Sequence, residues 1–509
     1  MSSSTPANLN ASSAKHVAVV GGGLSGLVAA FRLCEFSRES NAPIEVVVLE
    51  SQTRAGGVIE TRRVGDYLVE MGSDSFITNT PWAIDLCRRL GLSEQLIPTD
   101  AKYRRSLVLR KGRPVAVPEG FTLLAPAKVW PVIASPIFSP WGKLRMGMEY
   151  LIPRKPDKGD ESLASFVRRR FGREALDRLV QPLVGGIYTS DPERLSLCAT
   201  LPRFVEMERE HGSLIRATRR AASVQAKDEP QDSGARYGLF ASLAGGLSQL
   251  IEALVAHIKQ SGMIRLRSRV ERVAPPSSPE PSGLRRAEPS RQWSLIFQDG
   301  TLERFDAVIV ALPTYHAAKL VAGFAPSLAD SLAQIEYASS AVVVTGHRLE
   351  DVRHPLDAFG LVVPAAEGRD ILAVSFASRK FPGRAPEGRV LLRTFLGGAM
   401  QPEQCAKSDD ELIEITRREL AEIFGVKGQE DFAIVSRHAS AMPQYNVGHL
   451  ERVERIEQLA AAHPGLALAG NAYHGVGIPD CIHSGLQAAE RVFNEILAND
   501  RSKLSERPA

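Results

Sequence analysis

The sequence predicts an α/β fold built around a parallel sheet, and three patterns near the N-terminus support this. An apolar, strand-like run at 16–20 leads into a glycine-rich turn and a helix-like run from Leu24. A second apolar run, 44–49, ends at the acidic Glu50. Strand, glycine turn, helix, strand and acid in this order are typical of a Rossmann-like domain. A glycine pattern alone would be weak, but here both strands and the acid accompany it.

The glycine turn predicts a dinucleotide site. Gly21 makes the tight turn, Gly23 lets the backbone approach a pyrophosphate, and Gly26 allows close packing of helix and sheet. The helix N-terminus offers unpaired N–H groups to phosphates, and the acid can accept hydrogen bonds from a ribose. The residues predicted to share this contact are Gly21, Gly22, Gly23, Leu24, Ser25, Gly26 and Glu50.

Size and composition set limits on the remaining possibilities. A chain of 509 residues is too long to fold around one compact core, so two or more domains are expected. The net charge of +4 gives no case for nucleic acid. The five cysteines are scattered without C-x-x-C spacing, so neither a disulfide framework nor a metal site is predicted. No apolar run is long enough to span a membrane, and 1–14 is expected to be a disordered tail rather than a secretory signal.

Beyond the acid, the sequence departs from a simple NAD enzyme. Arg54 is followed by Gly56 and Gly57, and 58–61 and 67–70 predict short strands. This arrangement resembles the large superfamily of flavin-dependent amine oxidases and protoporphyrinogen oxidases, in which R-x-G-G follows the ribose acid. The resemblance implies FAD as cofactor, with Arg54 and the backbone of Gly56 and Gly57 near its phosphates.

The C-terminal part supports a flavin. A buried-strand pattern at 466–469 is followed by a glycine loop, 470–480, and an amphipathic helix expected over 481–497. A helix N-terminus aimed at the isoalloxazine would favour the negative charge of reduced flavin. A capped surface helix after a glycine loop is the plainer alternative.

Five separated segments resemble motifs of oxygen-dependent protoporphyrinogen oxidases and the related bacterial coproporphyrinogen oxidases. They occur in family order and span nearly the whole chain. The segments are the turn 72–76, the run 182–188 with Asp191-Pro192, and 381–386, 443–449 and 470–481.

This resemblance implies oxidation of a porphyrinogen, either coproporphyrinogen III or protoporphyrinogen IX, to the porphyrin in haem biosynthesis. Six electrons leave the macrocycle, with O2 as acceptor and H2O2 as product. The protein mainly positions a readily oxidised substrate against the cofactor, so we predict no catalytic side chain. His474 in the C-terminal loop is more simply explained as structural.

The resemblance also implies individual contacts. The backbone of Gly186 is expected near the macrocycle, Val362 is expected to pack on it, and Phe381 to stack on a pyrrole ring, with plain core packing as its alternative. Further cofactor contacts are expected at Gly72, Ser73, Asp74, Ser75, Val270, Gly470, Asn471, Val476, Gly477 and Ile478.

Two residues depart from the family. Ser106 takes the place of an arginine that pairs with a substrate propionate in plant and animal enzymes, and Arg105 would point to the other side of a strand. His438 stands where relatives usually carry a tryptophan near the flavin. A basic cluster slightly favours the tetracarboxylate coproporphyrinogen, although a solvated strand edge explains it nearly as well. Its members are Lys102, Arg104, Arg105, Arg110, Lys111 and Arg113.

The expected architecture is a discontinuous, Rossmann-like FAD-binding domain, an α+β substrate domain and a helical region that is a lid or a membrane contact. The expected ranges are 15–98, 238–325 and 435–497 for the first, 99–117 and 326–434 for the second, 118–237 for the third, and 498–509 for a C-terminal tail.

The segment 121–152 mixes apolar residues such as Trp130 and Trp141 with basic ones. It can lie on a membrane surface, where Lys and Arg meet anionic lipids, or pack as a lid over the pocket. We therefore expect a cytoplasmic protein and leave open peripheral contact with the inner face of the membrane, as well as a homodimer.

Other functions on the same scaffold stay open. An amine oxidase would need an aromatic cage before the flavin, and Tyr473 alone does not supply two walls. A carotenoid-type desaturase would need a long apolar tunnel. A non-catalytic FAD-fold binding protein is disfavoured by the intact Glu50, Arg54 and C-terminal glycine loop.

Overall fold

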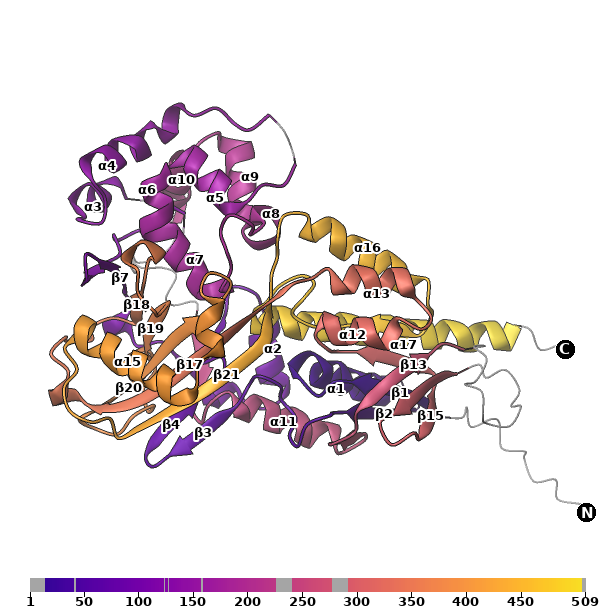
Figure 1. Ribbon diagram of the computed structural model, residues 1–509. Helices are drawn as coiled ribbons and strands as arrows, with labels where there is room; N and C mark the ends of the chain where they lie inside the picture. Colours follow the sequence, from indigo (N-terminus) through magenta and orange to yellow (C-terminus); the bar gives the residue numbers. More distant parts are fainter. Residues whose placement is uncertain are drawn as a thin grey trace, which may run out of the picture.

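The computed structural model describes residues 14–40, 43–122, 124–126, 128–156, 159–225, 240–276 and 292–505. A parallel sheet with its helices forms one part, a larger mixed sheet forms a second, and a helical region stands over the mixed sheet (Figure 1).

The parallel sheet is the predicted Rossmann-like core. Its order is β12-β2-β1-β16-β22, and every neighbouring pair is parallel. Alternate residues of β1 pack into two different apolar clusters, so the sheet is buried on both faces. The strands are β1 (Lys15–Val20), β2 (Ile44–Leu49), β12 (Met263–Arg265), β16 (Ala307–Val310) and β22 (Leu466–Leu468).

Helices from distant parts of the chain cover this sheet. The helix after the glycine turn, α1 (Leu24–Glu39), packs against the C-terminal α17 (Ile478–Ser505), and Figure 1 shows them side by side. The accompanying elements are α2 (Trp82–Arg89), α11 (Ser248–Ile258), α12 (Thr314–Val321), α13 (Pro326–Ala333), α16 (His449–Ala461), the meander β13 (Val270–Ala274), β14 (Trp293–Phe297) and β15 (Leu302–Phe305), and the small sheet of β5 (Phe76–Ile77), β11 (Phe240–Leu243) and β6 (Leu96–Pro98).

The strand expected at 58–61 lies further along the chain. The structure has β3 (Thr61–Val64) paired with β4 (Tyr67–Glu70). An added Cβ at Gly72 would lie 2.0 Å from the carbonyl oxygen of Val58. The backbone of 58–60 therefore lies tightly under the turn that follows β4, and the hairpin begins only beyond it.

The mixed sheet has seven strands in the order β21-β17-β20-β19-β18-β7-β8, antiparallel except for the pair β7–β18. One face packs on α15 (Asp409–Phe424), whose N-terminus carries a capping box of Ser408 and Glu411. The strands are β7 (Ser106–Arg110), β8 (Arg113–Ala116), β17 (Tyr337–Arg348), β18 (Gly360–Val362), β19 (Ala373–Phe376), β20 (Arg389–Gly397) and β21 (Phe432–Pro443), the last of which crosses the expected boundary at 435.

The helical region rests on β7, because Val108 belongs to its apolar core. A π-helical turn, η4 (Leu176–Val180), leads directly into α7 (Gln181–Tyr188), which faces the mixed sheet (Figure 1). The remaining helices are α3 (Val129–Ala134), α4 (Pro140–Gly147), α5 (Leu163–Arg170), α6 (Arg173–Ala175), α8 (Leu197–Thr200), α9 (Pro202–His211) and α10 (Leu214–Gln225), with the 3-10 turn η3 (Met148–Leu151).

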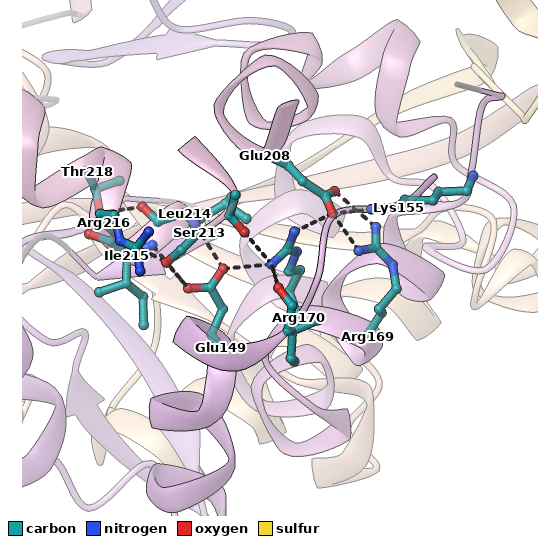
Figure 2. A network of polar contacts seen from close by, with 12 residues as sticks. Glu149, Lys155, Arg169, Arg170, Glu208, Ser213, Leu214, Ile215, Arg216 and Thr218 are labelled. Atoms are coloured by element: carbon teal, nitrogen blue, oxygen red, sulfur yellow. Dashed lines mark hydrogen bonds and ion pairs between the residues drawn. The ribbon is translucent and has the colours of Figure 1, made fainter. Parts of the chain in front are cut away.

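A buried ion-pair network joins the helices of this region (Figure 2). The side chains of Glu149 and Arg170 are both fully buried and lie 3.3 Å apart. Arg170 also pairs with Glu208 and donates to the carbonyl oxygen of Gly212 at 2.8 Å. Glu149 accepts from the backbone N–H of Leu214 at 2.9 Å. The network therefore connects η3, α5 and α9 with the start of α10.

Candidate cofactor and substrate site

The three glycines of the first turn are required for different reasons. Gly21 has φ +111°, and an added Cβ there would lie 2.3 Å from the carbonyl oxygen of Ala311. At Gly26 an added Cβ would lie 2.0 Å from the carbonyl oxygen of Gly21. Gly23 has no atom within 4 Å of such a Cβ, so the chain leaves open space beside the start of α1. This cradle fits a phosphate group that approaches the helix N-terminus.

Glu50 is fixed beside this turn at the end of β2. Its two carboxylate oxygens accept backbone hydrogen bonds, from Gly22 at 2.8 Å and from Gln52 at 2.7 Å. The residue is 8% exposed. Because a carboxylate has about four lone-pair sites, it keeps capacity for ribose hydroxyls.

Arg54 shapes a second glycine turn against the first. It donates to the carbonyl oxygens of Gly57 at 2.7 Å and Ile59 at 3.0 Å. The backbone N–H of Gly56 donates to Gly22 at 2.7 Å. The structure thus brings the predicted phosphate-side residues together, while a direct contact of Arg54 with a phosphate stays a prediction.

The C-terminal loop and α17 lie on the same side of the molecule as the glycine turn and α1. An added Cβ at Gly485 would lie 2.4 Å from the carbonyl oxygen of Ser25, so α17 packs tightly on α1. Gly470, with φ +145°, donates to the hydroxyl of Ser484 at 3.0 Å. The predicted contacts Gly470, Asn471, Val476, Gly477 and Ile478 therefore lie in the loop from β22 to the start of α17.

The turn after β4 holds a charge cluster that the sequence did not predict. Asp74 lies 2.9 Å from the ammonium of Lys380 and 3.1 Å from the guanidinium of Arg393, and Arg393 also donates to the carbonyl oxygen of Gly72. Burial would raise the pKa of Asp74, but these two cations outweigh it and hold the pKa below its usual range. Ser75 donates to Asp74 at 2.8 Å. The cluster fixes the segment from Gly72 to Ser75, including Ser73, against the mixed sheet.

Three other residues singled out from the sequence have clear surroundings. Val270 is buried in β13 and belongs to the same apolar cluster as Leu49 at the end of β2. His438 is hydrogen-bonded to the carbonyl oxygen of Met71 at 3.0 Å, and burial lowers its pKa. His474 is half exposed and lies 2.6 Å from Glu457 on α16, a surface contact that agrees with a structural role.

The structure brings together two of the three predicted substrate contacts. Gly186 is exposed on α7, and an added Cβ there would lie 3.7 Å from Val362. Val476 of the C-terminal loop packs against the same apolar cluster as Val362. Tyr188, at the end of α7, packs against this cluster too, and burial followed by the charge of Asp480 raises its pKa to about 12. Phe381 is 1% exposed, and its stacking role stays a prediction.

The fold separates the predicted basic cluster. Arg105 is exposed and pairs with Asp357 on the surface. Arg110, at the other end of β7, lines a cavity between the mixed sheet and the helical region. Arg105 and Arg110 therefore do not share one surface, although both belong to the predicted cluster.

Comparison with known proteins agrees with this geometry. The model of the family described as flavin containing amine oxidoreductase matches residues 24–493. The chain belongs to this family. Its cofactor is accordingly a flavin, and the predicted α/β fold with FAD is confirmed.

Relatives and solved structures are similar over nearly the full length. A coproporphyrinogen III oxidase of Staphylococcus aureus is 31% identical, with 95% of this chain and 100% of that protein covered. The coproporphyrinogen III oxidase of Bacillus subtilis is 33% identical, with 93% and 97% covered. A crystal structure from Exiguobacterium sp., provisionally named as a protoporphyrinogen oxidase, matches with a TM-score of 0.80 at 27% identity, with 96% of this chain and 99% of that one covered.

Two further properties of the described ranges bear on the site. Within them, no helix combines the length and the apolar character that crossing a membrane requires. The described part of the chain also contains no group of three His, Cys, Asp or Glu side chains placed to hold a metal ion.

Proposed function

We propose that the chain oxidises a porphyrinogen to the porphyrin in haem biosynthesis, with coproporphyrinogen III favoured over protoporphyrinogen IX. One observation carries the proposal: Gly186 and Val362 lie together near the end of α7, at an apolar cluster that Val476 of the C-terminal loop also packs against. The named relatives above are porphyrinogen oxidases, which supports the same substrate class.

FAD, when bound, accepts electron pairs from the macrocycle and passes them to O2, so that six electrons removed yield three molecules of H2O2. The chain's own residues hold it. The backbone around Gly23 would receive the pyrophosphate, the carboxylate of Glu50 would receive the ribose hydroxyls, and the N-terminus of α17 would favour negative charge on the cofactor.

The protein supplies position rather than an acid or base. The exposed backbone of Gly186 lets a flat macrocycle approach closely because no Cβ stands in the way. Val362 supplies an apolar surface beside it. A substrate held in this way would have a bridging carbon positioned for electron transfer to the cofactor.

An amine oxidase is less well supported. Such an enzyme would need exposed aromatic walls, but Tyr473 and Tyr445 are only 4% and 2% exposed. Tyr445 stacks on His449 and donates to the carbonyl oxygen of Asn471 at 2.7 Å, so its side chain belongs to the interior.

The deciding experiment mixes purified holoenzyme with each porphyrinogen without O2 and follows bleaching of the flavin absorbance and the rise of porphyrin fluorescence. Bleaching with either macrocycle supports the proposal. A flavin that stays oxidised with both, yet is bleached by a primary amine, would replace it with amine oxidation.

We also propose peripheral membrane contact through exposed apolar side chains of the helical region. Apolar side chains are strongly exposed there, with Trp130 at 75%, Trp141 at 80% and Leu151 at 81%. The nearby cations already have protein partners: Lys143 donates to the carbonyl oxygen of Ile133, and Arg145 donates to carbonyl oxygens at the end of α5. Contact is therefore expected through apolar insertion more than through attraction to anionic lipid.

This contact is testable by co-sedimentation with vesicles. The wild type should bind zwitterionic vesicles, with little gain from anionic lipid, and the double variant Trp130→Asp and Trp141→Asp should stay in the supernatant with its flavin retained. Equal sedimentation of both proteins would refute the contact.

A further inference from the structure

A cavity lined by charged residues lies along the seam where the helical region meets the mixed sheet. It has a volume of about 370 Å³ and lies between the turn η4 and the loop after β18. Figure 1 shows this seam where α6 and α7 stand over β7 and β18. The lining residues are Arg110, Arg173, Glu174, Asp177, Arg178, Pro364, Ala366 and Glu367.

The walls of the cavity continue along the chain into the segments that carry the proposed substrate contacts. Pro364 in its lining follows Val362 by two residues, which corresponds to about 7 Å along an extended chain. The opposite wall, η4, runs directly into α7, which carries Gly186. Both walls are therefore continuous with the residues proposed to contact the macrocycle.

Arg110 lies on the face of β7 that this seam requires. Val108 packs in the core of the helical region, whereas Leu107 and Leu109 pack in the core on the other side of the sheet. Because strand side chains alternate, Ser106 and Arg110 share the face of Val108. Arg110 thus places a cation on the face where Ser106 has none.

The guanidinium of Arg110 has unused hydrogen-bonding capacity. Its contact with Glu367 is long, at 3.8 Å, and its buried Nε has no partner. The oxygens of Glu367 instead accept from the backbone N–H groups of Lys111 at 2.9 Å and Gly112 at 3.0 Å. A guanidinium has five N–H donors, so Arg110 can still bind a carboxylate bidentately.

The other charges of the lining are engaged within the protein. Arg178 pairs with Glu174 and donates to the carbonyl oxygen of Ile137 at 2.9 Å. Glu174 also accepts from the hydroxyl of Ser139 at 2.6 Å. Arg173 pairs with Asp177 at the exposed rim. The carboxylates are thus tied to protein donors, which leaves Arg110 as the cation best able to receive an external anion.

We propose that this cavity receives a propionate of the macrocycle, with Arg110 as the charged partner that Ser106 cannot supply. The proposal rests on the proposed porphyrinogen oxidation and names a specificity-determining residue for it. A tetracarboxylate macrocycle gains from such a pocket because each charge-assisted bond made away from water adds to its affinity.

The test measures binding of porphyrin products rather than turnover. Holoenzyme is titrated with coproporphyrin III and with its tetramethyl ester, followed by porphyrin fluorescence. The variant Arg110→Met should weaken the free acid by about 10- to 100-fold and leave the ester nearly unchanged, since only the free acid offers carboxylates. KM for the porphyrinogen should rise with kcat largely retained.

Arg105→Met is the matched control, because it removes an arginine next to the same strand that is exposed and paired on the surface. It should bind both ligands as the wild type does. Equal binding of the free acid by Arg110→Met and the wild type, or equal weakening of acid and ester, would overturn the inference.

Arg110→Lys serves if the methionine variant does not retain flavin. Lysine keeps the charge but loses the planar fork, so binding of the free acid should weaken several-fold, and unchanged binding would again overturn the inference. The two proposals fail separately. A wild type that binds coproporphyrin III through Arg110 but bleaches with neither porphyrinogen would refute the oxidation alone.

Discussion

Replacing Glu149 by glutamine is expected to loosen the helical region while both sheets stay folded. Glu149 and Arg170 are fully buried, and truncating one partner of such a pair costs about 3–5 kcal/mol. Arg170 keeps its pairing with Glu208 and its bond to the carbonyl oxygen of Gly212, which favours the lower end, about 3 kcal/mol. A glutamine amide can also point its own N–H groups at the backbone N–H of Leu214, which would then lose its hydrogen-bond acceptor.

The expected loss is local, so hydrogen exchange is the suitable assay. About 3 kcal/mol corresponds to a rise in opening of about 100-fold, which should appear in the amides of α10 and α5. Amides of β1 should exchange as in the wild type, because the bonds of the network join η3, α5, α9 and the start of α10, all in the helical region. The matched control is Glu193→Gln, which breaks an exposed pair with Arg168 on α5 and should cost under about 1 kcal/mol.

Two results would refute this reasoning. If exchange in α10 is unchanged in Glu149→Gln, the buried pair does not hold the helices together. If exchange rises equally in β1, the helical region does not open separately from the parallel sheet.

Three further predictions concern the candidate cofactor site and the pH dependence of stability. Gly23→Val should melt like the flavin-free wild type and purify without flavin absorbance, because the added Cβ has no protein atom within 4 Å and points into the open cradle. Lys380 and Arg393 hold the pKa of Asp74 low against its burial. The carboxylate therefore stabilises the fold fully above about pH 4, and this stabilisation is lost as the pH falls. In thermal melts, Asp74→Asn should reduce the dependence of the melting temperature on pH in this acidic range. Burial lowers the pKa of His449 to about 4, so stability should fall as the pH drops from about 6.5 to 4, and His449→Phe should show a smaller fall.

The phosphate-side site could be predicted from the sequence because its signals are local. The roles of Gly21 and Gly26 follow from spacing between a strand and a helix, and the structure shows the close approaches that forbid a side chain there. The acid at the end of the second strand was equally readable, since two parallel strands bring their carboxyl ends to one edge.

The charge cluster at the turn after β4 could not be predicted. Asp74 lies in a short turn, whereas Lys380 and Arg393 come from a helix end and a strand of the mixed sheet. No spacing rule connects residues so distant along the chain. The strand expected at 58–61 was wrong for a similar reason. The backbone there packs closely under Gly72, so the hairpin begins further along the chain, at Thr61.

The basic cluster around β7 shows why substrate preference depends on the fold. In the sequence Arg105 and Arg110 carry the same weight. Once the strand is placed, one guanidinium is satisfied by Asp357 at the surface, while the other extends into a cavity with only a 3.8 Å contact to Glu367. Counting charges alone would have assigned carboxylate binding to both arginines. Only the cation whose neighbouring anion is occupied by backbone N–H groups can bind a carboxylate without breaking an existing pair, and that makes Arg110 the residue on which discrimination between macrocycles should depend.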